Sequence, residues 1–79
     1  MNMRIQVLGT GCPKCKELTR RTEAALRNLE LDVQVEKVTD LQRIIELGVM
    51  ITPALLVDGN VKAEGRIPSE IEIAALLRA

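Results

Sequence analysis

The 79-residue sequence contains no phenylalanine, tyrosine or tryptophan, so aliphatic side chains must form its hydrophobic core. Hydrophobic residues still make up 47% of the chain, which is enough for one small core of Leu, Ile, Val, Ala and Met. We therefore expect residues 1–79 to form a single domain.

Other absences exclude classes of function. Eleven basic residues balance eleven acidic ones, so no overall field favours nucleic acid or an anionic membrane as a partner. No stretch approaches the roughly 20 apolar residues that a membrane span requires. The N-terminus leads directly into a predicted strand and leaves no room for a signal peptide. We expect a cytoplasmic monomer without nucleic-acid or membrane partners.

The sequence has no histidine and only two cysteines, Cys12 and Cys15, so one chain cannot supply the four ligands of a structural zinc site. A disulfide between these cysteines would close a very short loop and contribute roughly 2 kcal/mol in the chain-entropy model. It would tie no distant elements together. Stapling the fold is therefore a poor explanation for the pair.

The cysteines belong to the segment 9–15, Gly-Thr-Gly-Cys-Pro-Lys-Cys. Residues 4–8 alternate as a strand does, and a helical pattern runs from the motif to about residue 29. A Cys-x-x-Cys at such a strand-to-helix junction is typical of a redox motif. We predict that Cys12 is the attacking nucleophile and that Cys15 is the resolving thiol, shielded by the first helical turn.

The neighbours of Cys12 favour its thiolate. Cys12 stands at the expected N-cap, where helix N–H groups and the macrodipole stabilise negative charge. Pro13 suits the first helical position, where its missing N–H costs nothing. Lys14 and Lys16 add positive charge. Gly11, together with the glycine two residues before it, lets the chain turn sharply and leaves the sulfur uncovered.

The remaining pattern alternates strands and helices. We predict strands at 31–38, 54–57 and 61–64, and helices at 39–47 and from 69 onward. Residues 58–60, Asp-Gly-Asn, indicate a hairpin turn. The predicted caps are Thr39 with Gln42 and Ser69 with Glu72, and Gly48 is the predicted stop of the second helix. The predicted apolar side of the last helix comprises Ile71, Ala74, Ala75, Leu76 and Leu77, with Ile73 at its flank.

The element order is β-α-β-α-β-β-α. Because strand–helix–strand crossovers are right-handed, the first two strands should be parallel, and the hairpin adds an antiparallel pair. The predicted fold class is α/β, a four-stranded mixed sheet with helices on both faces.

The segment 9–15 and the later Gly-Val-Met-Ile-Thr-Pro-Ala-Leu at 48–55 resemble the small thioredoxin/glutaredoxin-like redox-active disulfide proteins of archaea and bacteria. The resemblance implies a thioredoxin-like fold and a thiol–disulfide oxidoreductase that cycles a Cys12–Cys15 dithiol and disulfide. Such a protein reduces protein disulfides or carries electrons, receives them from a thioredoxin-reductase-type donor, and needs no cofactor or metal.

The same resemblance implies that Pro53 follows a cis peptide bond beside the Cys-x-x-Cys. Thr52, the residue before it, would offer its backbone to the substrate chain. The expected apolar collar around this site comprises Gly11, Val49, Met50, Ile51 and Gly65.

The chain departs from the larger families in several places. Thioredoxins have Trp where Gly11 stands, and they place a buried carboxylate under the motif, whereas residues 3–8 contain no acid. Glutaredoxins bind glutathione with a Tyr at the position of Lys14 and a Gly-Gly-acid stretch, whereas Gly65 here precedes Arg66.

Two other functions use the same cysteines. A Cu(I) chaperone also presents Cys-x-x-Cys after its first strand, with Met50 as a third soft ligand. However, that fold has two strands after its first helix, whereas residues 39–47 here have a helical pattern. A redox-regulated binding module is the other alternative, and measured dithiol turnover would separate it from an oxidoreductase.

Overall fold

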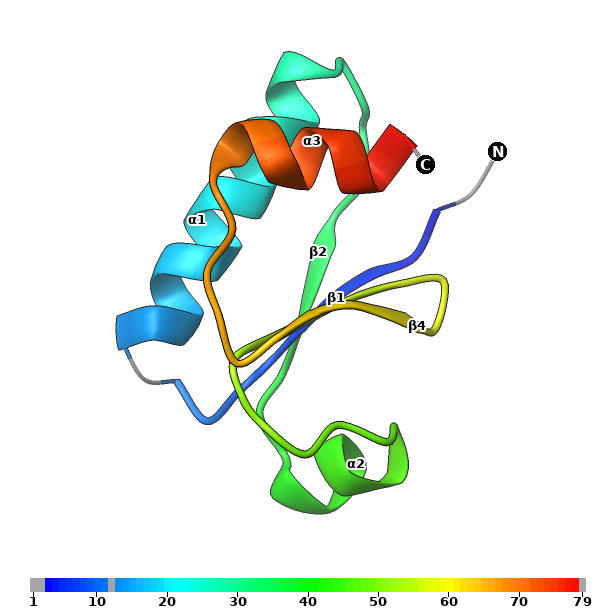
Figure 1. Cartoon of the computed structure of the whole chain (residues 1–79). Coiled ribbons are helices and arrows are strands. Elements are labelled where there is room, and N and C mark those ends of the chain that lie inside the picture. The colour runs from blue at the N-terminus through cyan, green and yellow to red at the C-terminus, as the bar shows by residue number, and fades with distance from the viewer. Residues whose placement is uncertain (1–2, 12, 79) are drawn as a thin grey trace.

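The computed structural model describes residues 3–11 and 13–78. Seven elements follow one another in the predicted β-α-β-α-β-β-α order. Figure 1 shows their arrangement, and their bounds are β1 Ile5–Leu8, α1 Pro13–Asn28, β2 Val35–Val38, α2 Leu41–Glu46, β3 Ala54–Val57, β4 Asn60–Glu64 and α3 Glu70–Arg78.

The strands form one mixed sheet in the order β2-β1-β3-β4. β1 pairs with β2 in parallel and with β3 in antiparallel orientation, and β3 pairs with β4 in antiparallel orientation. The predicted parallel crossover and hairpin are therefore confirmed. This architecture is the thioredoxin-like α/β fold.

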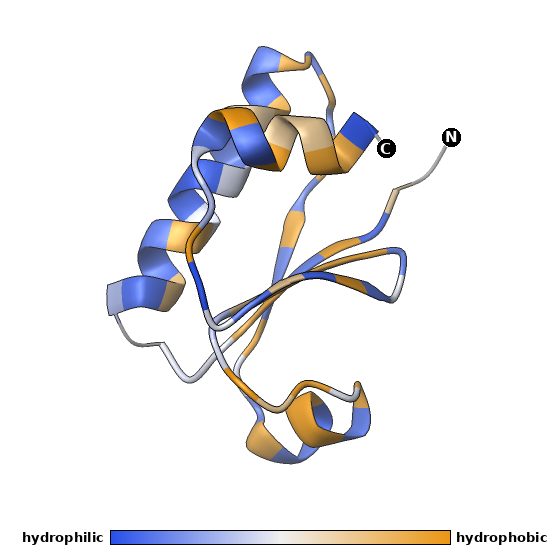
Figure 2. Ribbon diagram, viewed as in Figure 1, coloured by the Kyte–Doolittle hydropathy of each residue, from blue (hydrophilic) through white to orange (hydrophobic). Residues whose placement is uncertain are grey.

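Alternation along the strands separates two hydrophobic cores. Ile5 and Val7 of β1 lie in the first core, with α1 and α3, which we call the α1–α3 core. Leu8 lies in the second, which includes Ile44 of α2 and which we call the α2 core. All residues of β1 and β3 are buried because helices cover both faces of the sheet. In Figure 2 the central strands are largely apolar, whereas the outer positions of α1 are polar.

The hairpin between β3 and β4 has the predicted turn. Asp58 and Gly59 have φ angles of 53° and 83°, and positive φ at both central residues is the property of a type I′ turn. The Asp58 carboxylate also accepts a hydrogen bond from the Arg4 backbone N–H at 2.8 Å. This contact ties the turn to the start of β1.

Two predicted element starts were wrong by more than one residue. β2 begins at Val35 rather than at residue 31, because Val35 pairs with Ile5, the first residue of β1, and β1 offers no earlier partner. α2 begins at Leu41, and its N-cap is Asp40 rather than Thr39, since the Asp40 side chain accepts from the Gln42 N–H at 3.2 Å.

The predicted face of α3 was right for Leu77 and Ala74 but wrong for Ile71 and Ile73. Ile73 is fully buried, whereas Ile71 is 82% exposed. Ile73 and Leu77 are four residues apart and share the side that packs against the sheet and α1. Ile71 precedes Ile73 by two positions, which turns its side chain to the opposite side of the helix. The predicted cap at Ser69 is present, because its hydroxyl accepts from the Glu72 N–H at 3.2 Å.

Candidate active site

The site lies at one end of the sheet, where the ends of all four strands are aligned. In the register, Val38, Leu8, Ala54 and Glu64 form one row across the four strands. The residues just beyond this row therefore lie near one another, although they are far apart in sequence. They are Thr39 after β2, Gly9 after β1, Pro53 before β3 and Gly65 after β4.

Gly9 forms the backbone seat of the Cys15 sulfur. Its N–H donates to the Val38 carbonyl at 2.9 Å, which extends the parallel ladder by one residue. A Cβ atom on Gly9 would overlap with Cys15 Sγ and would lie 3.1 Å from Cys15 Cβ. Only glycine therefore lets the chain pass the sulfur this closely. The sequence predicts that this glycine turns the chain and exposes the first sulfur, whereas its contact with Cys15 is visible only in the fold.

Cys15 is the third residue of α1 and is 5% exposed. Its backbone carbonyl accepts a hydrogen bond from the Thr19 hydroxyl at 3.0 Å. Cys15 is therefore buried, while its predicted role as the resolving thiol stays a prediction. Cys12, the predicted nucleophile, lies outside the described residues, so its predicted contact with Pro53 stays a prediction.

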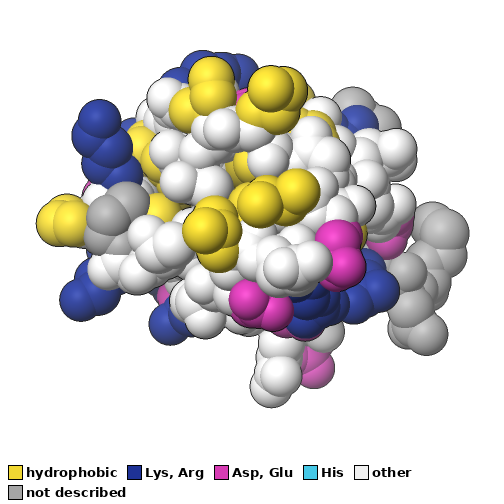
Figure 3. Space-filling view, turned by 90° about the horizontal axis from the view of Figure 1, so that it is seen from below, with side chains coloured by type: hydrophobic (Ala, Val, Ile, Leu, Met, Phe, Trp, Pro, Cys, Tyr) yellow, Lys and Arg dark blue, Asp and Glu magenta, His cyan; other side chains and the backbone are white. Residues whose placement is uncertain are grey.

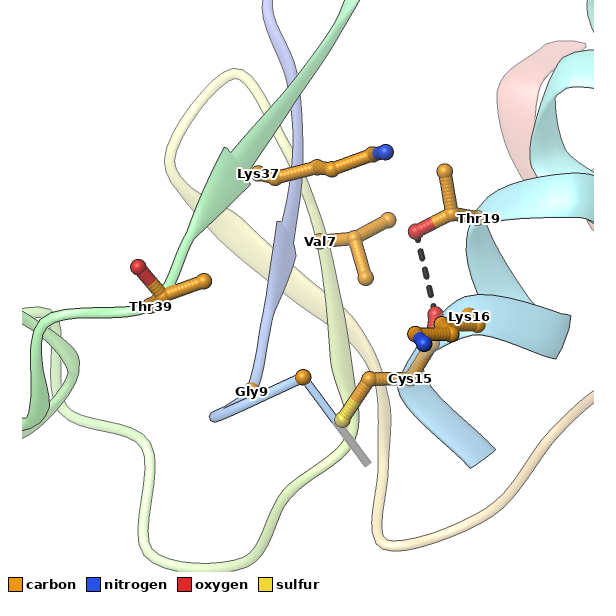
Figure 4. Close-up of a pocket in the computed structure, with 8 residues that line it drawn as sticks. Val7, Gly9, Cys15, Lys16, Thr19, Lys37 and Thr39 are labelled. Carbon is orange, nitrogen blue, oxygen red and sulfur yellow. Dashed lines mark hydrogen bonds between the residues drawn. The ribbon is translucent and has the colours of Figure 1, made fainter. Parts of the chain in front are cut away.

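A pocket of about 170 Å³ opens beside Cys15, between α1 and the β1–β2 side of the sheet. In Figure 4 the side chains of Lys37 and Thr19 extend toward each other from β2 and α1, with Val7 between them. The full lining consists of Val7, Gly9, Gly11, Cys15, Lys16, Thr19, Lys37 and Thr39. The lining thus combines the apolar Val7 with two lysines and two threonines.

Lys37 is not among the predicted site residues, although strand alternation offers a signal for it. Val33, Val35 and Lys37 share one side of an alternating strand. Lys37 pairs in register with Val7, which belongs to the α1–α3 core. On this side of the edge strand β2, Lys37 is exposed, and it reaches the pocket beside the redox motif.

The start of α1 carries positive charge, as predicted. Pro13 is its first residue, its first turn contains no acidic residue, and Lys14 and Lys16 are exposed. Glu17 follows one turn later, but hydrogen bonds from Arg20 and Arg21 lower the pKa of its carboxyl to about 2. These two arginines offset the negative charge of the helix nearest the motif.

The Thr52–Pro53 peptide bond is cis, as the family resemblance implied. Pro53 is buried and Thr52 is exposed. The Thr52 Cβ lies 4.0 Å from the position that a Cβ on Gly9 would take, so Thr52 and Cys15 flank the same glycine. The structure thus brings the motif and the proline segment together at one place.

The predicted collar is only partly present. Met50 is 91% exposed and Ile51 is 59% exposed beside Thr52. A Cβ on Gly65 would lie 2.7 Å from Ile51 Cγ2, so the Ile51 side chain covers this glycine. Val49, however, is 4% exposed and belongs to the α2 core, because its side chain faces inward. Val49 is therefore not a collar residue.

Exposed apolar side chains continue from this loop over α2. Leu41 and Ile45 of α2 are 61% and 65% exposed. Figure 3 shows apolar side chains gathered on the underside of the molecule, where α2 lies in Figure 1. The site is therefore bordered by a large apolar surface.

In the ranges 3–11 and 13–78, no three His, Cys, Asp or Glu side chains gather into a group that could hold a metal ion. Nor does any helix within these ranges have the length and hydropathy needed to cross a membrane.

Comparison with known proteins gives a consistent result. The family model for the thioredoxin domain matches residues 3–78. A thioredoxin of Methanothermobacter thermautotrophicus is 39% identical over 75 residues, which cover 95% of this chain and 97% of that protein. A thioredoxin of Methanocaldococcus jannaschii is also 39% identical over 75 residues, covering 95% of this chain and 86% of that protein.

Proposed function

We propose a mechanism from one premise, namely that this chain belongs to the thioredoxin family, to which its family match and its two relatives assign it. Proteins of this family are thiol–disulfide oxidoreductases, and so is this chain. We propose further that it reduces protein disulfides, or carries electrons to them, with the pair Cys12 and Cys15. The Cu(I) chaperone has no support among the relatives.

In the first step, the Cys12 thiolate attacks one sulfur of a substrate disulfide. A Cys12–substrate disulfide forms, the substrate S–S bond breaks, and the released thiolate takes a proton from solvent. The positive charge of Lys14 and Lys16 at the start of α1 supports this assignment, because the thiolate is the nucleophile in such an exchange.

In the second step, Cys15 loses its proton and attacks Cys12 Sγ. The Cys12–Cys15 disulfide forms, and the substrate leaves as its second thiolate, so two electrons have passed to the substrate. Lys37 lines the pocket beside Cys15, and its positive charge would favour the loss of this proton. A dithiol donor of the thioredoxin-reductase type would then restore the pair by the reverse exchange.

The contact of Cys15 with Gly9, with Thr52 on the other side of that glycine, is the observation that carries the proposal. It brings the predicted resolving thiol to the residue that the family resemblance assigns to substrate binding. A substrate backbone held at Thr52 would lie next to the reacting sulfurs.

The test is reduction of a protein disulfide such as insulin by the dithiol form. We expect Cys12→Ser to abolish turnover, and Cys15→Ser to retain the first step and accumulate mixed disulfides. Alkylation should show Cys12 titrating below the roughly 8.5 of an ordinary thiol. If Cys15 is alkylated first and at lower pH, the assignment of the two cysteines is wrong. Absence of turnover in the unmodified protein would favour the redox-regulated binding module.

The partners and the setting remain predictions. We propose a monomer that works in the cytoplasm on protein disulfides. Trapping with the Cys15→Ser variant in a cell lysate would identify the substrates, because each would stay attached to Cys12 through a disulfide. A size measurement of the reduced protein would test the monomer.

A further inference from the structure

Glu64, the last residue of β4, makes an unusual contact with the segment before Pro53. Its Oε2 atom accepts hydrogen bonds from two successive backbone N–H groups, those of Met50 at 2.8 Å and Ile51 at 3.2 Å. The bonded residues are 14 and 13 positions apart in the sequence, so these bonds form only when the sheet is folded. Hydrogen bonds to a carboxylate are among the stronger ones in proteins.

The same end of β4 holds the other side of this segment. The Gly65 N–H donates to the Pro53 carbonyl at 2.8 Å, and Ala54 pairs with Glu64 in the ladder. Thr52 therefore lies between two anchored points, the Glu64 carboxylate before it and the Gly65 amide after it. Residues 50–52 belong to no helix or strand, so regular hydrogen bonding does not fix their backbone.

Apart from the Ile51 side chain, which covers Gly65, the side chains of this segment add little packing. Met50 and Ile51 are mostly exposed, and Thr52 is exposed as well. Proline has no N–H with which to contribute a further hydrogen bond. The Glu64 carboxylate is thus the principal polar contact that orders the backbone immediately before Thr52.

We propose that Glu64 is a positioning residue that fixes residues 50–52 in the conformation that receives an extended peptide beside the reacting cysteines. The inference rests on the proposed role of Thr52 in substrate binding. Glu64 acts through the loop and touches neither sulfur in this scheme. Its contribution should therefore concern substrates with a peptide chain, and not small disulfides that Cys12 can attack without using Thr52.

The experiment compares Glu64→Ala, Glu64→Gln and Glu64→Asp with the unmodified protein, using a peptide disulfide and the small aromatic disulfide DTNB. We expect Glu64→Ala to raise the KM for the peptide on the order of tenfold, with kcat changed by less than about twofold. Its rate with DTNB should stay within about twofold. Amide hydrogen exchange at Met50 and Ile51 should become faster in parallel.

The two conservative variants separate hydrogen bonding from charge and reach. Gln retains an acceptor oxygen at the same distance and should restore the peptide KM to within about threefold of the unmodified protein. Asp keeps the charge but is one methylene shorter, and should restore it less well. It also serves if Glu64→Ala does not fold. Glu23→Ala, at an exposed carboxylate on α1, is the matched control and should leave both substrates unaffected.

An unchanged peptide KM in folded Glu64→Ala or Glu64→Asp would overturn the proposal, and so would an equal loss with DTNB and the peptide. A Gln variant as impaired as the Ala variant would do the same, because the acceptor would then not matter. Failure of the broader function looks different, since turnover would be absent from the unmodified protein or would persist in Cys12→Ser.

Discussion

On one side of the sheet, two helices pack together over the strands, while on the other a single six-residue helix covers them. The α1–α3 side buries Leu18 and Ile73 completely and seats Cys15 against Gly9. The α2 side buries Ile44 but leaves Leu41 and Ile45 largely exposed. Cys15, the proposed resolving cysteine, thus lies on the densely packed side of the molecule.

The segment before Pro53 belongs to the other side. Val49 anchors it in the α2 core, and Glu64 holds its next two amides. From this difference we infer that the α1–α3 side holds the reacting Cys15 in place and that the α2 side binds the substrate protein. Local stability varies within a domain, and binding segments are drawn from its less stable parts.

The largest expected effect is in the α1–α3 core. Leu26 is 3% exposed between α1 and the sheet, so Leu26→Ala removes buried methyl groups and leaves a cavity. We expect a loss of about 2–5 kcal/mol in the free energy of unfolding, measured by urea denaturation. A change below about 1 kcal/mol would show that this core does not dominate stability.

Ile44→Ala is the matching change in the α2 core. Ile44 is 2% exposed, but α2 is short and has a largely exposed surface. We expect a loss of about 2 kcal/mol, near the lower end of the range for such truncations. The variant should also raise the KM for a peptide disulfide, since Val49 packs in the same core. If Ile44→Ala costs more than Leu26→Ala, the comparison of the two sides is wrong.

Gly9→Ala tests the seat of Cys15 directly. The new methyl group would overlap with Cys15 Sγ, and the first turn of α1 leaves the sulfur little room to move. We expect overpacking to cost about 1–3 kcal/mol. Resolution by Cys15 should slow, so mixed disulfides should accumulate during turnover and be visible by mass spectrometry. Thr10→Ala, at the exposed neighbouring residue, is the control. If the two variants behave equally, Gly9 does not make the close contact with Cys15 Sγ that we describe.

Lys37→Met tests the pocket and should have a smaller effect. The change keeps a long side chain but removes the ammonium group that faces the pocket beside Cys15. A positive charge favours the thiolate, so resolution of the mixed disulfide should slow by about threefold, with the first step unchanged. Rapid-quench kinetics separate the two steps. Lys62→Met on β4 is the control. If it slows resolution as much as Lys37→Met does, the pocket has no specific role in resolution.

The sequence predicted the elements whose signals are local. Asp58 and Gly59 specify their turn, Pro13 begins its helix, and Gly48 ends another at a φ of 84°. The face of α3 was not predictable in this way, because apolar residues occupy most of its sides and only packing against α1 selects Ile73 and Leu77.

The features of the site also divide into those with a local sequence signal and those that depend on the fold. The cis bond before Pro53 and the place of Cys15 near it were predictable from the motif and from the family resemblance. The seat at Gly9 and the contact of Glu64 with Met50 and Ile51 were not, because both depend on the register that aligns four strand ends. Lys37 is an intermediate case, since strand alternation places it on the same side as Val35, although it is exposed there.

The smallest expected effect concerns the charged surface residues of α1 on the α1–α3 side. Glu17 accepts from Arg20 and Arg21, and Arg21 also donates to the carbonyls of Ile67 and Pro68 just before α3. These contacts link α1 to the start of α3. Because the pKa of Glu17 is lowered to about 2 from an ordinary 4.5, its contribution to stability is fully present above about pH 4.5 and is lost as the pH falls through 2.

Glu17→Gln should therefore lower the urea midpoint slightly at pH 7, and the difference from the unmodified protein should shrink between pH 4.5 and pH 2. The effect should be small and should weaken in high salt, because the pair is at the surface. Other carboxyls titrate in the same range, but they do so in both proteins and cancel in the difference. A difference that stays constant down to pH 2 would show that Glu17 supports the α1–α3 side by packing and not by its charge.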